Sequence, residues 1–309
     1  MYNANTETLF LKINLNSEIY DLYNGRIKKE DVYNDILRRF SEKNEFIKKE
    51  FSPEGEKRET KFEFINTIKN EKEKTIYGEV LKQAKIKTKR YDKKTRKFIY
   101  KRIDTNEVVK FYYDIRKETV VYNIANRFGY TEFCAAFEGL INKSFPFDGK
   151  FKVAVYREGV NIDEIKNKLL SLGCIRLLKI NFIPPNPRDE LLEAIEKNGE
   201  KRLNELKEAN VTERSVIFKS LNSKGLNINS SMLNKELTNA VDIHSDMLSG
   251  EAVKKGYVTV QAEEGSGRTY TTEDNRPLTV DINKKSVEDI NLFIIECKKS
   301  LIMFFKRHK

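Results

Sequence analysis

The densest group of residues able to do binding chemistry lies between positions 85 and 102. Ten of these eighteen residues are Lys or Arg, and Asp92 is the single acid among them. The whole chain has 58 basic and 47 acidic residues, so 48 basic and 46 acidic residues remain outside this basic segment. The net charge of +11 is therefore concentrated in one place. Such a concentration predicts a polyanionic partner.

The basic segment also has the residue pattern of a β-hairpin. Lysines at positions 85, 87 and 89 alternate with other residues, which is the period of a strand. Residues 91–95 are polar, and Asp92 suits an early turn position. In the second run, the even-numbered residues 96–102 share one face and the odd-numbered residues share the other. The residues that we predict to contact nucleic acid are Lys85, Lys87, Lys89, Arg90, Lys93, Lys94, Arg96, Lys97, Phe98, Tyr100, Lys101 and Arg102.

The expected partner is DNA or RNA, bound through its backbone. Two-stranded ribbons fit a nucleic-acid groove, and Tyr91, Phe98 and Tyr100 suit stacking on the bases of a single strand. No arginine-to-guanine pattern is legible, so we expect phosphate contacts rather than sequence-specific contacts. Two alternatives stay open. The hairpin is a solvated edge that its lysines protect from aggregation, or it binds another anion such as an acidic protein.

Residues suited to acid–base or metal chemistry are sparse. The two histidines are His244 and His308, which is poor material for a two-histidine nuclease or a three-histidine metal site. Asp242 and Asp246 share a helix face, but His244 between them points away, so we assign no metal site. The Glu-x-Lys matches at 164–166 and 205–207 fall on predicted helices, which disfavours a restriction-type nuclease core. The weak candidates for site carboxylates are Asp114, Asp189, Asp242 and Asp246.

No cofactor is expected, because the chain has neither a phosphate-binding Gly-rich loop before a helix nor a nucleophile elbow. Three scattered cysteines argue for a reducing compartment and against disulfides. The amino-terminal residues lack the features of a signal peptide, and no stretch has the length of an apolar membrane span. We therefore expect a cytoplasmic protein.

The elements that must position these residues predict an α+β fold. We expect mostly antiparallel sheets with flanking helices, a protruding basic β-hairpin and a long C-terminal helix. A change in pattern near residues 144–149 predicts two regions, 1–145 with the basic hairpin and 146–309 with the terminal helix. A strand–helix–strand unit is expected over 151–183.

Four helix predictions are specific enough to check against the structure. Residues 17–51 show helical spacing, which we expect Gly25 to break into two helices. Helices are also expected over 188–209 and 230–255. Ser286 to Asp289 resembles a capping box that opens the terminal helix.

The terminal helix, residues 286–309, carries more apolar residues than one packing face needs. The excess predicts either burial in the core or a homo-oligomer, with a dimer favoured and Phe304 and Phe305 near the contact. Its basic end leaves membrane-surface contact as a lesser alternative.

Three stretches of the chain carry a resemblance to a known family. These are VVKFYYDIRKETVVYNIANRFGYTEFCAAFEGLI at 108–141, IRLLKINFIPPNPRD at 175–189, and the late segments GYVTVQ and RTYTTEDNRP. Over about residues 75–283, the chain resembles a bacterial domain-of-unknown-function family found among phage-defence genes. The resemblance implies a role in antiviral defence and assigns no catalytic residues.

The function favoured by these observations is a nucleic-acid-binding component, a sensor or subunit, of a bacterial antiviral system. Other proteins of the same operon are candidate partners. A metal-dependent nuclease effector and a scaffold that binds an acidic protein remain alternatives. An enzymatic activity is undecided, and binding alone is favoured.

Overall fold

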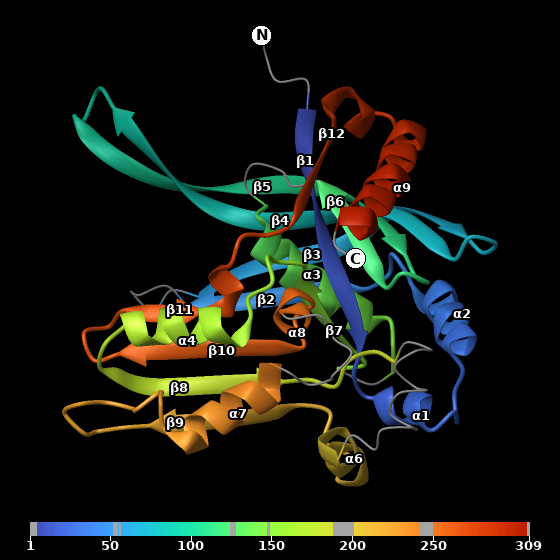
Figure 1. Ribbon diagram of the computed structural model, residues 1–309. Helices are drawn as coiled ribbons and strands as arrows, with labels where there is room; N and C mark the ends of the chain where they lie inside the picture. The colour runs from blue at the N-terminus through green and yellow to red at the C-terminus, as the bar shows by residue number, and fades with distance from the viewer. Residues whose placement is uncertain are drawn as a thin grey trace. The chain divides into compact units, whose positions relative to one another are not determined.

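The computed structural model describes residues 5–51, 55, 57–123, 128–146, 149–187, 201–241 and 250–307. Figure 1 shows an α+β fold, with two sheets and flanking helices. The chain divides into two units: Met1–Leu11, Glu30–Gly149 and Thr279–Lys309 form the first, and Lys12–Lys29 and Lys150–Leu278 form the second. Among the described residues, no helix is both long and apolar enough to cross a membrane.

The two units differ from the continuous regions 1–145 and 146–309 that the sequence predicts. The first unit takes in residues 279–309 because β12 (Thr279–Asn283) pairs with β1 (Asn5–Leu15). This pairing is antiparallel and runs from Asn5 opposite Asn283 to Leu9 opposite Thr279. Contacts between the two ends of a chain leave no local mark in the sequence, so pattern analysis does not find them.

The larger sheet has the strand order β12-β1-β6-β5-β4-β3-β2, and β7 also pairs with β1. The pairs β2–β3, β3–β4, β4–β5, β5–β6 and β1–β12 are antiparallel, as expected. Figure 1 shows the strong curl of this sheet and the long β4–β5 hairpin that protrudes from it. The strands are β2 (Glu45–Phe51), β3 (Lys57–Asn70), β4 (Thr75–Asp92), β5 (Lys97–Asp114), β6 (Thr119–Asn123) and β7 (Phe151–Val155).

The core of the first unit is aromatic. Helix α3 (Tyr130–Lys143) buries Phe133 and Phe137 completely. The Phe137 ring centroid lies 5.3 Å from that of Phe111 on β5 and 5.5 Å from that of Phe64 on β3. Burial of each such ring stabilises the fold by on the order of 2 kcal/mol. The cluster therefore holds α3 against the strands that lead into the hairpin.

The prediction of helix from residue 17 to residue 51 is correct in part. Helices α1 (Ile19–Tyr23) and α2 (Lys29–Arg39) are separated at Gly25, which has the positive φ of 66°. Beyond Arg39 the prediction is wrong, because residues 45–51 form β2. Phe46 of β2 pairs with Phe62 of β3, and their ring centroids are 6.1 Å apart. Pairing with β3 overrides the helical spacing of this segment.

The smaller sheet belongs to the second unit and has the order β11-β10-β8-β9. Helix α4 (Ile162–Ser171) begins at Asn161, whose side chain forms a reciprocal capping box with Glu164. The strands on either side of α4, β7 and β8, lie in different sheets, so the predicted strand–helix–strand unit is not a βαβ crossover. The strands are β8 (Ile175–Phe182), β9 (Arg214–Lys219), β10 (Val258–Glu264) and β11 (Thr269–Thr271), followed by a short 3₁₀ helix, η1 (Thr272–Asp274).

Two predicted helices of the second unit fall partly outside the described residues. Of the helix expected over 188–209, the structure describes α6 (Lys201–Glu208). The helix expected over 230–255 is not continuous. Helix α7 (Ser231–Val241) and the short α8 (Glu251–Lys254) are separated by residues 242–249, which are not described, and by Gly250, whose φ of 81° is left-handed.

The C-terminal helix α9 (Ile290–Arg307) follows a 3₁₀ turn, η2 (Lys284–Val287). Its cap is Asp289, whose Oδ1 accepts a hydrogen bond of 2.8 Å from the Leu292 backbone N–H. The predicted capping box at Ser286 is therefore wrong, since Ser286 lies in the 3₁₀ turn. The inner face of α9 packs on β12 and β6. Phe304 belongs to this inner face, because its ring stacks on Phe10 with 4.2 Å between centroids.

Candidate nucleic-acid interface

The basic segment forms the outer half of the β4–β5 hairpin. Strands β4 and β5 pair from Thr75 opposite Asp114 to Asp92 opposite Lys97. The pairing of β3 with β4 ends at Ala84, and the pairing of β6 with β5 ends at Phe111. Residues 85–104 are therefore a two-stranded ribbon, which we call the arm (Figure 1). Eight residues of β4 at about 3.4 Å each make the arm about 27 Å long.

The turn at the tip of the arm is built by Asp92. Its carboxylate accepts hydrogen bonds from the Lys94 backbone N–H at 2.8 Å and from the Thr95 hydroxyl at 2.9 Å. These hydrogen bonds hold the pKa of the Asp92 carboxyl below its usual value. Arg96 has the left-handed φ of 52°, which brings the chain back into β5. The expected turn is present, displaced by about one residue toward the C-terminus.

Strand register decides which side chains share a face of the arm. Lys89 lies opposite Tyr100, Tyr91 opposite Phe98, and Lys87 opposite Arg102. Side chains that are opposite one another in an antiparallel pair project to the same face. We call the described residues on this side, from Arg102 outward to the turn, the aromatic face. Its members are Lys89, Tyr91, Phe98, Tyr100 and Arg102.

The aromatic face is exposed and its members contact one another. Tyr91 and Phe98 meet edge to face with 5.3 Å between centroids, and the Lys89 Nζ lies 4.1 Å from the centre of the Phe98 ring. The exposed fractions are 49% for Tyr91, 54% for Phe98 and 58% for Tyr100. Exposed rings beside cations can stack on bases while the cations contact phosphates. This arrangement can contact both the bases and the phosphates of a nucleic acid.

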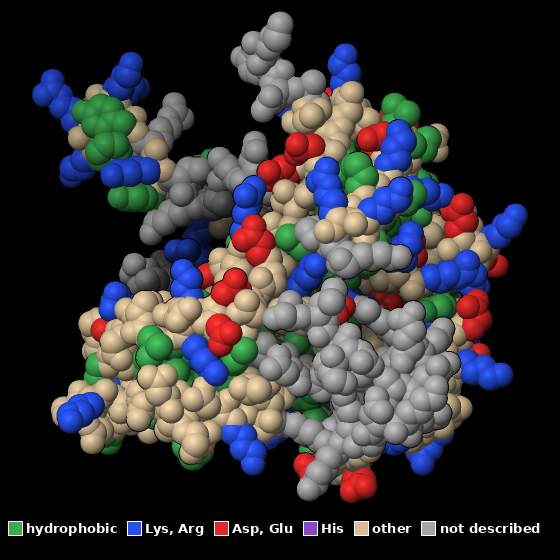
Figure 2. All heavy atoms as spheres, viewed as in Figure 1, with side chains coloured by type: hydrophobic (Ala, Val, Ile, Leu, Met, Phe, Trp, Pro, Cys, Tyr) green, Lys and Arg blue, Asp and Glu red, His purple; other side chains and the backbone are tan. Residues whose placement is uncertain are grey.

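The remaining predicted contact residues surround this face. Lys93, Lys94 and Arg96 lie in the turn, Lys97 closes it, and Lys85 lies at the base of the arm. Figure 2 shows Lys and Arg side chains around a hydrophobic group at the arm's end. Among the described side chains, Lys93, Lys94, Arg96 and Lys97 have no carboxylate within 4 Å, so their charge is uncompensated. The side chains of Lys87, Arg90 and Lys101 lie outside the described part of the chain.

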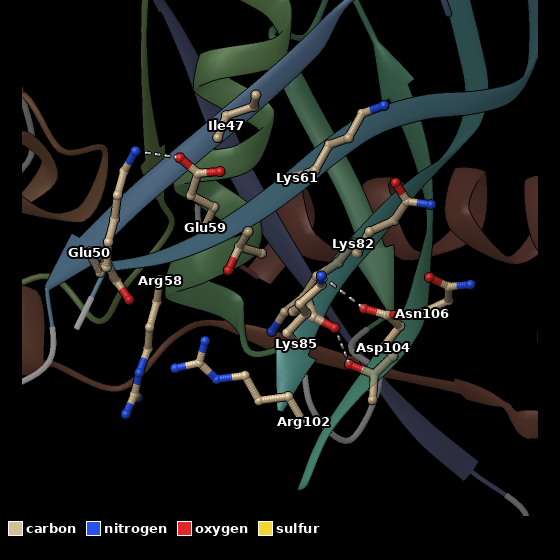
Figure 3. A pocket seen from close by; sticks show the side chains of 15 residues that line it. Ile47, Glu50, Arg58, Glu59, Lys61, Lys82, Lys85, Arg102, Asp104 and Asn106 are labelled. Atoms are coloured by element: carbon tan, nitrogen blue, oxygen red, sulfur yellow. Dashed lines mark hydrogen bonds and ion pairs between the residues drawn. The ribbon is translucent and has the colours of Figure 1, made fainter. Parts of the chain in front are cut away.

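A cleft that the sequence did not predict opens at the base of the arm. It has a volume of about 1060 Å³ and lies where the β2–β3 hairpin separates from β4 and β5 (Figure 3). Ion pairs occupy part of its wall, such as Lys57 with Glu59 at 2.7 Å. The sequence signal that could have found it is the pair Lys57-Arg58, which begins β3 and follows closely after Pro53-Glu54-Gly55 in the sequence. The charged lining residues are Glu50, Lys57, Arg58, Glu59, Lys61, Lys82, Lys85, Arg102 and Asp104.

Of the four candidate site carboxylates, the structure describes Asp114 alone. Asp114 ends β5, and its carboxylate accepts a hydrogen bond from the Lys117 backbone N–H at 3.0 Å, as a turn residue does. The other candidates, Asp189, Asp242, His244, Asp246 and His308, lie outside the described residues. The part of the chain that is described holds no cluster of three His, Cys, Asp or Glu side chains able to bind a metal ion. The Glu-x-Lys sequences lie on α4 and α6, as predicted.

Comparison with known proteins places the chain in a family. Residues 24–295 match the family described as Domain of unknown function (DUF4747). The chain belongs to this family. The match begins after β1, includes the arm, the cleft and strands β2 to β12, and ends inside α9. A search of curated proteins finds no match to the chain.

Proposed function

We propose that this protein binds nucleic acid through the arm, by contacts to the sugar–phosphate backbone. The observation that carries the proposal is the register of β4 and β5. It gathers Lys89 and the rings of Tyr91, Phe98 and Tyr100 on one exposed face. A solvated edge hairpin needs lysines but has no need of three exposed rings beside them. The charge of the arm and its aromatic face together favour a polyanion with planar groups.

The biological setting is a further part of the proposal. A cytoplasmic sensor or subunit of a bacterial antiviral system would meet foreign nucleic acid, and the resemblance noted above supports this role. Neighbouring genes would test it directly, because a defence component is expected beside other defence genes. Binding through phosphates would suit a sensor that responds to any foreign sequence.

The test is fluorescence anisotropy with labelled single-stranded DNA, single-stranded RNA and duplex DNA at 50 and 200 mM salt. If the protein makes six to ten phosphate contacts, the rise from 50 to 200 mM salt should weaken binding on the order of 10³-fold or more. Reversing four exposed arm charges should abolish detectable binding. This arm variant carries Lys89→Glu, Lys93→Glu, Lys94→Glu and Lys97→Glu.

The control reverses four exposed charges of the second unit, so that net charge changes equally. It carries Lys168→Glu, Lys219→Glu, Lys224→Glu and Lys235→Glu. We expect this control to bind within about threefold of the wild type, since salt screens charges that do not contact the bound nucleic acid. Absence of binding to all three nucleic acids at 50 mM salt would refute the proposal. Equal losses in both variants would show a general charge effect and no role for the arm.

A further inference from the structure

The cleft at the base of the arm is formed by a divergence of strands. β3 and β4 remain paired up to Thr60 opposite Ala84, and beyond this pair the β2–β3 hairpin and the arm separate. Lys57 and Arg58 of β3 lie on one side of the cleft, and Lys85 and Arg102 of the arm lie on the other. Figure 3 shows side chains from both sides converging on the space between them.

The lining of the cleft has a surplus of positive charge. Six of its residues are Lys or Arg and three are acidic. Each acidic residue is already paired: Glu59 with Lys57 at 2.7 Å, Asp104 with Lys85 at 3.9 Å, and Glu50 with Lys48 at 2.5 Å. Lys48 does most to hold the pKa of the Glu50 carboxyl below its usual value, and Arg58 and Lys82 add to it. Two of the six cations are also paired with acids outside the lining, Lys61 with Glu45 at 2.7 Å and Lys82 with Glu132 at 2.5 Å. The attraction for an entering anion therefore comes chiefly from Arg58, with Lys57, Lys85 and Arg102 beside it.

The cleft is continuous with the aromatic face. Arg102 lines the cleft and also belongs to the aromatic face. Toward the tip, the next described pairs on the same side are Lys89 with Tyr100 and Tyr91 with Phe98. A continuous surface therefore runs from the cleft at the base of the arm, past Arg102, to the exposed rings of the aromatic face at the tip.

We infer that the cleft and the aromatic face form one site for a single-stranded nucleic acid. This inference rests on the proposed function and adds the class of ligand. The phosphates of a strand contact Arg58 and Lys57 in the cleft, and its bases stack on Phe98 and Tyr100. Stacking requires bases with a free π-face, which a duplex does not offer along its length. The cleft volume of about 1060 Å³ lies at the upper end of small-molecule sites, so it has room for a chain of a few nucleotides.

The experiment compares the wild type with a cleft variant, Lys57→Glu with Arg58→Glu. Both residues are exposed, so the variant should fold, and circular dichroism with a thermal melt checks this. The matched control reverses two exposed lysines, Lys69 at the other end of β3 and Lys72 in the turn that follows, as Lys69→Glu with Lys72→Glu. Affinities are measured by anisotropy for a 16-nucleotide single strand and for a duplex of the same length.

We expect the cleft variant to bind the single strand about tenfold more weakly than the control does. The slope of log affinity against log salt should fall by about 1.4, because two phosphate contacts of a single strand are lost at about 0.7 each. Duplex binding should be equal in the cleft variant and the control. A neutral variant, Lys57→Gln with Arg58→Gln, should lie between the wild type and the charge reversal.

Each outcome separates this inference from the proposed function. If the wild type binds both ligands and the cleft variant equals the control, the arm binds nucleic acid and the cleft inference is overturned. A wild type that prefers duplex to single strand also overturns it. If the wild type binds neither ligand, the proposed function itself has failed.

Discussion

Gly139 shows how one residue position joins two elements of the first unit. It lies on α3 where the ring of Phe46 from β2 crosses the helix. A Cβ atom at Gly139 would stand 2.5 Å from the Phe46 ring, well inside van der Waals contact. In an exposed helix, Gly→Ala is worth up to about 1 kcal/mol of stability. Here the clash should dominate, because neither the helix backbone nor the paired strand can move freely.

We predict that Gly139→Ala lowers the free energy of unfolding by about 1–3 kcal/mol. Urea denaturation followed by circular dichroism measures this change. The control is the double variant Gly139→Ala with Phe46→Ala, in which the clash is removed and only the lost ring and the helix propensity of Ala contribute. If Gly139→Ala alone stabilises the protein, then β2 does not lie against α3 in solution.

At the scale of one element, α9 has two apolar faces with different roles. Phe304 is 1% exposed and stacks on Phe10, whereas Ile302 is 52% exposed. We predict that Phe304→Ala lowers the free energy of unfolding by about 3–5 kcal/mol, as for other large-to-small changes in a core. Ile302→Ala should change it by less than about 0.5 kcal/mol. Urea titrations at low protein concentration compare the two variants.

A large cost for Ile302→Ala under these dilute conditions would contradict this assignment of faces. It would mean that the outer face of α9 is covered within its own chain. Phe305 is not informative here, because its ring contacts that of Phe304 at 5.2 Å and a change there would disturb the core.

At the scale of the whole molecule, the outer face of α9 bears on assembly. Leu292, Ile295 and Ile302 are 49%, 46% and 52% exposed, and they fall on one side of the helix. Exposed apolar rows of this kind mark interaction sites, and two-fold dimers are the commonest closed assembly. The sequence placed the expected dimer contact near Phe304, but Phe304 is in the core. We therefore place the expected dimer contact on this outer row.

We predict a mass near twice the 36.2 kDa of one chain by light scattering at micromolar concentration. Leu292→Glu with Ile302→Glu should return the mass to that of one chain without unfolding it. The matched control changes two exposed apolar residues of the second unit, Leu170→Glu with Ile217→Glu, and should keep the larger mass. A wild type with the mass of one chain would contradict the prediction.

Local pattern in the sequence determined the basic hairpin and the strand, helix and strand over 151–183 to within a few residues, and it placed a long helix near the C-terminus. It succeeded because alternation and helical spacing record which face of an element is buried, and burial is the dominant local constraint. It also found the positive charge of the arm and the rings beside it, since these need no tertiary information. It failed for residues 45–51, where Phe46 fits a helical stripe as well as it fits a strand.

Tertiary structure alone decided the features on which the proposed function depends. The side of the arm that Lys89 shares with Phe98 and Tyr100 follows from strand register, and a shift of one residue would have separated them. The cleft exists because β3 leaves β4 at Ala84, and the first unit is closed by β12 pairing with β1. These are contacts between segments far apart in the chain. Their energy comes from pairing and packing across the fold, so no window of the sequence contains it.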